Sequence, residues 1–112
     1  MMPGERAIYV LGATRSTVEL KIGYSADPHR RALEVRSYLG HDIVPLDVYR
    51  VPGCTSNKVA WHVEHALHAA IEAAGFYRKH GGEVFSRSAF EASQLRRWVR
   101  NYALKKGWQR VG

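Results

Sequence analysis

Two side chains in the middle of the chain, Glu64 and His68, combine a carboxylate with an imidazole at a spacing of four residues. On a helix this spacing places both on one face, where the histidine can hydrogen-bond the carboxylate or help to transfer a proton. Arg31 offers a planar fork of donors that suits phosphate oxygens. These residue types indicate proton transfer beside an anion. The plainer interpretation is a packing histidine and a helix-surface arginine.

Tyr9 and Lys21 lie in two short segments, 7–11 and 18–24, that are separated by the polar stretch GATRST. The first segment is apolar and the second alternates, which is typical of a β-hairpin. If the hairpin turns around Arg15, Tyr9 faces Lys21, and both lie on the face of the sheet opposite the core. An exposed aromatic–cation pair is the plain interpretation of this arrangement.

Helices and further strands must position these residues. Asp27 and Pro28 predict a helix start, and Gly40 predicts its end. The predicted strands are 7–11, 18–24 and 43–51, and the predicted helices are 28–38, from Ser56 or Asn57 to about 74, and 88–106. RKHGGEVFS is expected to be a turn-rich link. The order β-β-α-β-α-α predicts one α+β domain over residues 1–112, with a small three-stranded antiparallel sheet flanked by helices.

Three short motifs occur in order along these elements: Ala-Ile-Tyr at 7–9, Lys-Ile-Gly at 21–23 and Glu-x-x-Leu-His at 64–68. With Gly-Glu-Val-Phe at 82–85, they resemble the GIY-YIG nuclease superfamily. The closer resemblance is to a phage-associated branch with a Lys-Ile-Gly second motif and a Gly-Glu-Trp-Phe box. It covers residues 7 to about 86. Ala7, Lys21 and Val84 replace the superfamily's Gly and Tyr and the branch's Trp, respectively.

The resemblance implies a GIY-YIG-like fold and a metal-dependent endonuclease that hydrolyses DNA phosphodiester bonds. It implies that Glu64 binds one Mg²⁺ or Mn²⁺ ion and that Arg31 binds phosphate. It also implies that Tyr9 takes or relays the proton of the attacking water. A tyrosine phenolate at pH 7 costs about 4 kcal/mol at the ordinary pKa. We therefore expect Lys21 to lower the pKa of Tyr9, or to bind the scissile phosphate.

Two neighbours of this predicted site have open roles. His68 is expected to assist catalysis beside Glu64, and Glu83 either contacts the site or only shapes a turn. A zinc site is the alternative for this region, because His62, His65 and His68 recur every three residues and Cys54 is near in sequence. No second cysteine is present and the spacing matches no zinc motif, so we favour Mg²⁺ or Mn²⁺.

Segment 88–106 is predicted to be a basic amphipathic helix. Its apolar side would carry Phe90, Leu95, Trp98, Val99 and Tyr102. Its basic residues, together with two arginines of the first helix, are expected to bind DNA phosphates without reading sequence. This set comprises Arg30, Arg36, Arg96, Arg97, Arg100 and Lys105. A merely solvated basic face is the alternative.

The 112 residues carry 17 Lys and Arg against 10 Asp and Glu, and the resulting net charge of +7 favours a polyanionic partner. The single cysteine excludes an internal disulfide, and neither a signal peptide nor a membrane-spanning run is recognised. A cytoplasmic location without a membrane partner is expected, with residues 1–5 as a loose leader.

The favoured function is a DNA endonuclease that works as a homodimer or with a separate specificity domain. One alternative is a non-catalytic DNA-binding module on the same fold. The other is a protein-interaction or inhibitor domain that uses the aromatic C-terminal helix. Metal-dependent cutting separates the first alternative from the nuclease, and salt-dependent DNA binding argues against the second.

Overall fold

The structure is a computed structural model that describes residues 4–112. Its elements are β1 (Ala7–Ala13), β2 (Leu20–Ser25), α1 (Pro28–Leu39), β3 (Ile43–Arg50), α2 (Asn57–Ala73), the 3₁₀ turn η1 (Lys79–Gly81), β4 (Val84–Phe85), α3 (Ala89–Lys106) and β5 (Gln109–Arg110). Over this range the chain is α+β, with three α-helices and an antiparallel five-stranded sheet in the order β4-β2-β1-β3-β5. The prediction of three strands was wrong, because two residues are too few to show alternation.

The starts of α1 and α2 follow the predicted capping residues, Asp27 and one of the pair Ser56 or Asn57, whereas no capping residue was predicted for α3. Asp27 accepts a hydrogen bond from the Arg30 backbone at 3.2 Å, and Pro28 occupies the first turn of α1. Ser56 caps α2 in the same way at 3.2 Å. Ser88 accepts from the Glu91 backbone at 3.0 Å to start α3. These contacts are local, and the sequence predicted the first two.

The hairpin pairing differs from the prediction by two residues. Tyr9 faces Gly23 and Leu11 faces Lys21, so the paired residues lie symmetrically about Ser16 rather than Arg15. Ser16 adopts a positive φ of 50°, which tightens the turn there. A shift of two residues preserves the side-chain face, so Tyr9 and Lys21 still lie on the same face of the sheet.

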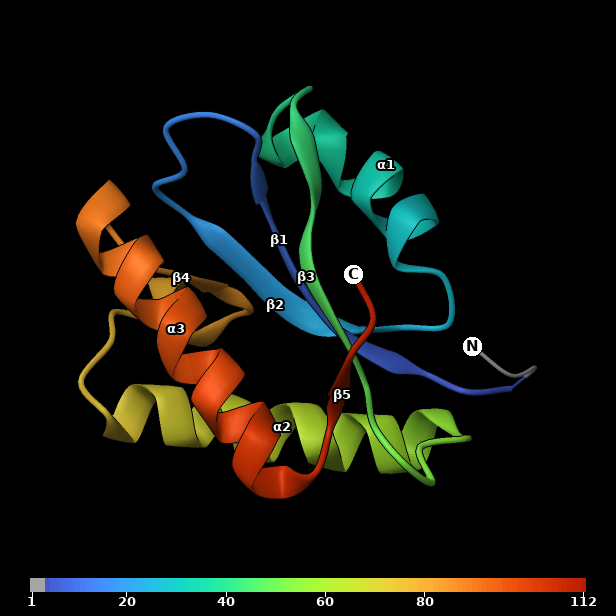
Figure 1. Cartoon of the computed structure of the whole chain (residues 1–112). Coiled ribbons are helices and arrows are strands. Elements are labelled where there is room, and N and C mark those ends of the chain that lie inside the picture. The colour runs from blue at the N-terminus through green and yellow to red at the C-terminus, as the bar shows by residue number, and fades with distance from the viewer. Residues whose placement is uncertain (1–3) are drawn as a thin grey trace.

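Helices cover both faces of the sheet (Figure 1). The face with Ile8 and Ile22 packs against α2 and α3 and forms the larger core. The opposite face, with Tyr9 and Leu11, packs against α1. Tyr9 and Lys21 are therefore buried, and the expectation of an exposed pair was wrong.

Two further expectations need correction. Phe90 was placed on the apolar side of the last helix, but its side chain is exposed, and Ala92 and Ala103 occupy the buried stripe of α3 instead. Residues 1–3 of the expected loose leader lie outside the described range. Glu5, also assigned to that leader, is buried and forms an ion pair with Arg50 at 2.8 Å.

Candidate active site

The outer edge of β2 is where the sequence-predicted catalytic residues meet. β4 is only two residues long, so it pairs with the first part of β2 and leaves the rest of that edge open. The Ile22 amide donates to the Glu83 carbonyl at 2.9 Å, and the Ile22 carbonyl accepts from His68 Nε2 at 2.7 Å. The next outward-facing amide, that of Tyr24, hydrogen-bonds Glu64. Side chains of α2 therefore continue the hydrogen bonding where β4 stops.

Two carboxylates lie together at this edge. Glu64 is 3% exposed, and its carboxyl group contacts that of Glu83. Burial raises the pKa of Glu64 well above its ordinary value, and the neighbouring Glu83 raises it further. The pair therefore holds a proton in the absence of another cation, with Glu64 as the protonated partner.

Lys21 neutralises the other carboxylate. Its buried ammonium forms an ion pair with Glu83. Burial alone would raise the pKa of Glu83, but the hydrogen bond and the charge of Lys21 outweigh burial and hold that pKa below its usual range. We expected Lys21 to lower the pKa of Tyr9. The register instead places Tyr9 opposite Gly23, and Lys21 acts on the pKa of Glu83.

Tyr9 lies across Gly23. A β-carbon at Gly23 would come within 2.6 Å of the Tyr9 hydroxyl oxygen and 2.9 Å of the ring, so glycine leaves the space that this ring occupies. Tyr9 is 1% exposed, and burial raises its pKa to about 12, although the nearby Arg31 opposes the shift. The phenol is therefore neutral at pH 7, and a phenolate there would cost about 7 kcal/mol.

Arg31 connects the Tyr9 phenol to solvent. It lies at the partly exposed edge of α1, where the guanidinium interacts with the Tyr9 hydroxyl. The same guanidinium forms an ion pair with Glu34 Oε2 at 3.4 Å. It is thus the cation of this cluster that a phosphate can reach from outside.

His68 is as enclosed as Tyr9, and each is 1% exposed. Because the Ile22 carbonyl can only accept, Nε2 carries the proton and Nδ1 presents a lone pair. Nδ1 lies 3.8 Å from Glu64 Oε1 and 3.5 Å from Arg78 Nη2. Burial lowers the pKa of His68, which keeps the ring neutral. The ring lies beside Glu64 and covers the part of the β2 edge next to Ile22.

A family model, the T5orf172 domain, matches residues 6–103, which is most of the chain and includes the whole cluster. The chain belongs to the T5orf172 domain family. This is a phage-associated family related to nucleases. No curated protein and no solved structure matches the chain significantly.

Two further residues belong to the cluster of this T5orf172 domain. The role of Glu83 was left open, and its side chain contacts both Lys21 and Glu64. Arg78 was not singled out at all, although it contacts His68 and donates to the Gly82 carbonyl at 2.7 Å. Both lie in the link before β4, and no sequence periodicity marks such a link.

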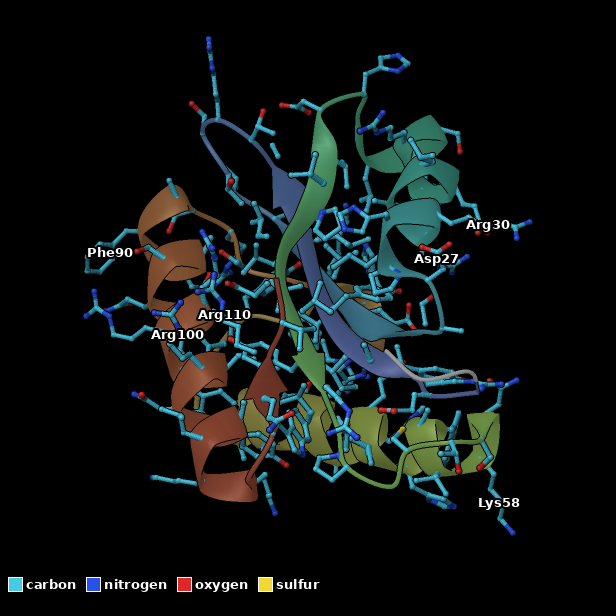
Figure 2. The ribbon with its side chains drawn as sticks, turned by 45° about the vertical axis from the view of Figure 1, so that its right-hand side comes forward. Asp27, Arg30, Lys58, Phe90, Arg100 and Arg110 are labelled. Atoms are coloured by element: carbon cyan, nitrogen blue, oxygen red, sulfur yellow. The ribbon has the colours of Figure 1, made fainter. Side chains whose placement is uncertain are left out.

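The predicted DNA-binding residues of the T5orf172 domain divide between two sides. Figure 2 shows Arg30 on the α1 side of the sheet and Arg100 on the α3 side. Of the remaining α3 cations, Arg97 and Lys105 are exposed, while Arg96 is partly buried against Asp47. Arg36 donates to the Ile43 carbonyl at 3.1 Å and fastens α1 to β3.

The alternative zinc site gains no support from the geometry. Among residues 4–112, no group of three or more His, Cys, Asp or Glu side chains is arranged to hold a metal. Cys54 is buried in the main core, whereas His62 and His65 are exposed on α2. Within the same range, no helix is both long and apolar enough to cross a membrane.

Proposed function

We propose that this T5orf172 domain is a metal-dependent endonuclease that hydrolyses DNA phosphodiester bonds. The observation that carries the proposal is the contact between the buried Glu64 carboxyl group and the partly exposed Glu83 carboxylate, which Lys21 holds at the part of the β2 edge beyond β4. A strongly perturbed carboxyl group beside other ionisable side chains favours a functional site over a structural one. The nuclease-related family and the net charge of +7 support DNA as the substrate.

The carboxylates fit one Mg²⁺ or Mn²⁺ ion. Both cations prefer oxygen ligands, and Mg²⁺ keeps several waters, so Glu64 and Glu83 suffice as protein ligands. Two carboxylates in contact, one of them buried, repel each other unless a proton or a cation lies between them. A bound cation would take the place of the proton on Glu64, lower the pKa of a bound water and offset charge on the phosphate.

The remaining side chains have distinct tasks in this proposal. Arg31 binds the scissile phosphate from the solvent side and stabilises its extra negative charge. Tyr9 is neutral because its pKa is raised. It therefore relays the proton of the attacking water as a phenol and does not act as a preformed phenolate base. Lys21 keeps Glu83 ionised, and the Nδ1 lone pair of neutral His68, beside Glu64, accepts a proton. Arg30, exposed on the same side as Arg31, holds flanking phosphates.

A plasmid-cutting assay with and without Mg²⁺ tests the proposal. Wild-type protein should nick or linearise the plasmid only with the metal, and Glu64→Gln should reduce the rate by about 100-fold or more. Glu19→Gln is the matched control, because Glu19 is exposed and its ion pair is with Lys79, which is outside the cluster. Metal-independent binding of DNA without any cutting would instead make the chain a non-catalytic DNA-binding module.

A further inference from the structure

A tryptophan is exposed on α2 beside the candidate site. Trp61 is 48% exposed and lies one helical turn before Glu64. Its indole stacks on the His65 ring with centroids 3.7 Å apart and planes inclined by 26°. His65 Nδ1 and the Trp61 carbonyl are 2.8 Å apart, which ties that ring to the helix backbone. The stack is therefore preformed.

The stack is continuous with the candidate active site. On α2, Glu64 and His68 belong to the buried stripe, and Trp61 and His65 occupy the adjoining solvent-exposed stripe. The His65 and His68 ring centroids are 6.0 Å apart. The rings of Trp61, His65 and His68 therefore form a series that extends from the exposed surface of α2 to the side of the Glu64 carboxyl group.

The surroundings of this stack suit a polyanion. Lys58 lies on the first turn of α2, three residues before Trp61, and extends into solvent (Figure 2). His62 packs edge-on against the indole, with ring centroids 5.0 Å apart. No acidic residue lies between Lys58 and Trp61 in the sequence, and the chain as a whole carries +7. A flat aromatic surface beside a cation binds a nucleobase and its phosphate.

We propose that Trp61, supported by His65, stacks on an unpaired nucleobase next to the phosphodiester bond that is cut. The inference rests on the proposed nuclease function and specifies its substrate. A base inside a duplex has both faces covered by its neighbours, so it cannot stack on Trp61 without leaving the helix. The preferred substrate is accordingly DNA with at least one unpaired nucleotide at the cleavage site, such as a single strand, a flap or a mismatch.

The test measures binding separately from cutting. A fluorescein-labelled single-stranded 12-mer and the matching duplex are titrated in EDTA with the wild type, Trp61→Ala, Trp61→Phe and Phe90→Ala, with anisotropy as the readout. Trp61→Ala should weaken binding of the single strand by about 5- to 150-fold and leave duplex binding nearly unchanged. Trp61→Phe should restore most of the affinity, because it keeps an aromatic face.

Phe90→Ala is the matched control, because Phe90 is an exposed aromatic residue on α3 rather than beside the site. It should bind both DNAs as the wild type does. Equal loss of single-strand and duplex affinity in Trp61→Ala, or no loss of either, would overturn the inference. Because no metal is present, the binding result does not depend on cutting. An absence of cutting in the plasmid assay would defeat the nuclease proposal and the placement beside a cut bond, and the anisotropy titrations would still decide whether Trp61 stacks on an unpaired base.

Discussion

On the α3 side of the sheet, the buried Asp47 carboxylate receives Arg96 Nε at 2.9 Å and Arg110 Nη2 at 2.7 Å. At the β2 edge, the buried Glu64 carboxyl group lies beside a second carboxylate, Glu83, and the one lysine there pairs with Glu83. The first cluster joins opposite charges that satisfy each other's hydrogen bonds. The second brings like charges together, and its electrostatics oppose folding unless a proton or cation is added.

This difference distinguishes a structural cluster from the cluster that we propose to be functional. Asp47 fastens β3 to α3 and to the C-terminal strand, so its ion pairs support the fold. Repulsion between Glu64 and Glu83 does not stabilise the fold. A carboxylate pair of this kind favours a site that binds a cation. The two arginines that follow each other on α3 also differ: Arg96 forms an ion pair with Asp47, whereas Arg97 is exposed and is the better candidate for the proposed contact with DNA.

The largest loss of stability is expected from a substitution at Gly23, the position of the β2-edge cluster that lies closest to the Tyr9 ring. Gly23→Ala places a β-carbon against the Tyr9 phenol, which is enclosed and cannot rotate away, so the unfolding free energy should fall by about 3 kcal/mol. Urea denaturation measures this change. Gly82→Ala is the control: its β-carbon comes no closer than 3.4 Å to the Lys79 carbonyl and its φ is −91°. Equal tolerance of both substitutions would show that Gly23 is not needed for Tyr9.

Asp47→Asn should separate stability from activity. It leaves two guanidinium groups without their carboxylate partner, but both arginines are more than a third exposed, at 38% and 43%, and remain hydrated. We expect a loss of about 2 kcal/mol in urea denaturation, with plasmid cutting unchanged where the protein is folded. A fall in the cutting rate of the folded variant would mean that the two clusters are coupled.

Glu64→Gln should raise the free energy of unfolding, whereas Asp47→Asn should lower it. The pKa of Glu64 is raised in the folded state, so between its ordinary value near 4.5 and the raised value the folded protein binds more protons than the unfolded chain. The stability of the wild type therefore falls as pH rises through this window, and glutamine escapes that loss. In EDTA, the advantage of the variant should grow from pH 4.5 upward to at least about 1 kcal/mol. If the difference in unfolding free energy between the variant and the wild type stayed constant across pH, Glu64 would not have the raised pKa that the carboxylate pair requires.

The smallest effect is expected on the α3 surface. Arg97→Gln should weaken DNA binding by about 3-fold, reduce its salt dependence by about one ion and leave the melting temperature unchanged. Arg96→Gln should lower the melting temperature, since it removes a partner of Asp47. Titrations at several salt concentrations, with melting curves alongside, compare the two neighbours. If Arg97→Gln lowered the melting temperature and Arg96→Gln only weakened DNA binding, the distinction between the paired Arg96 and the exposed Arg97 would be wrong.

Much of this arrangement could be predicted where the interactions are local. The capping of α1 by Asp27 and of α2 by Ser56 depends on residues within one turn, and the structure confirms both. The shared face of Tyr9 and Lys21 depends only on the alternation of a strand, and it survived an error of two residues in register. The one-face spacing of Glu64 and His68 follows from the helix repeat alone.

The remaining features depend on contacts between residues far apart in sequence. β4 and β5 have two residues each, and their pairing is decided by β2 and β3 rather than by a pattern of their own. Glu83 reaches Lys21 across 62 positions, so no spacing could indicate that contact. The sequence by itself determined which residue types face which way. Only the tertiary structure decided that Lys21 serves Glu83 rather than Tyr9, because the direction of a pKa shift depends on burial and on the charge that lies nearest.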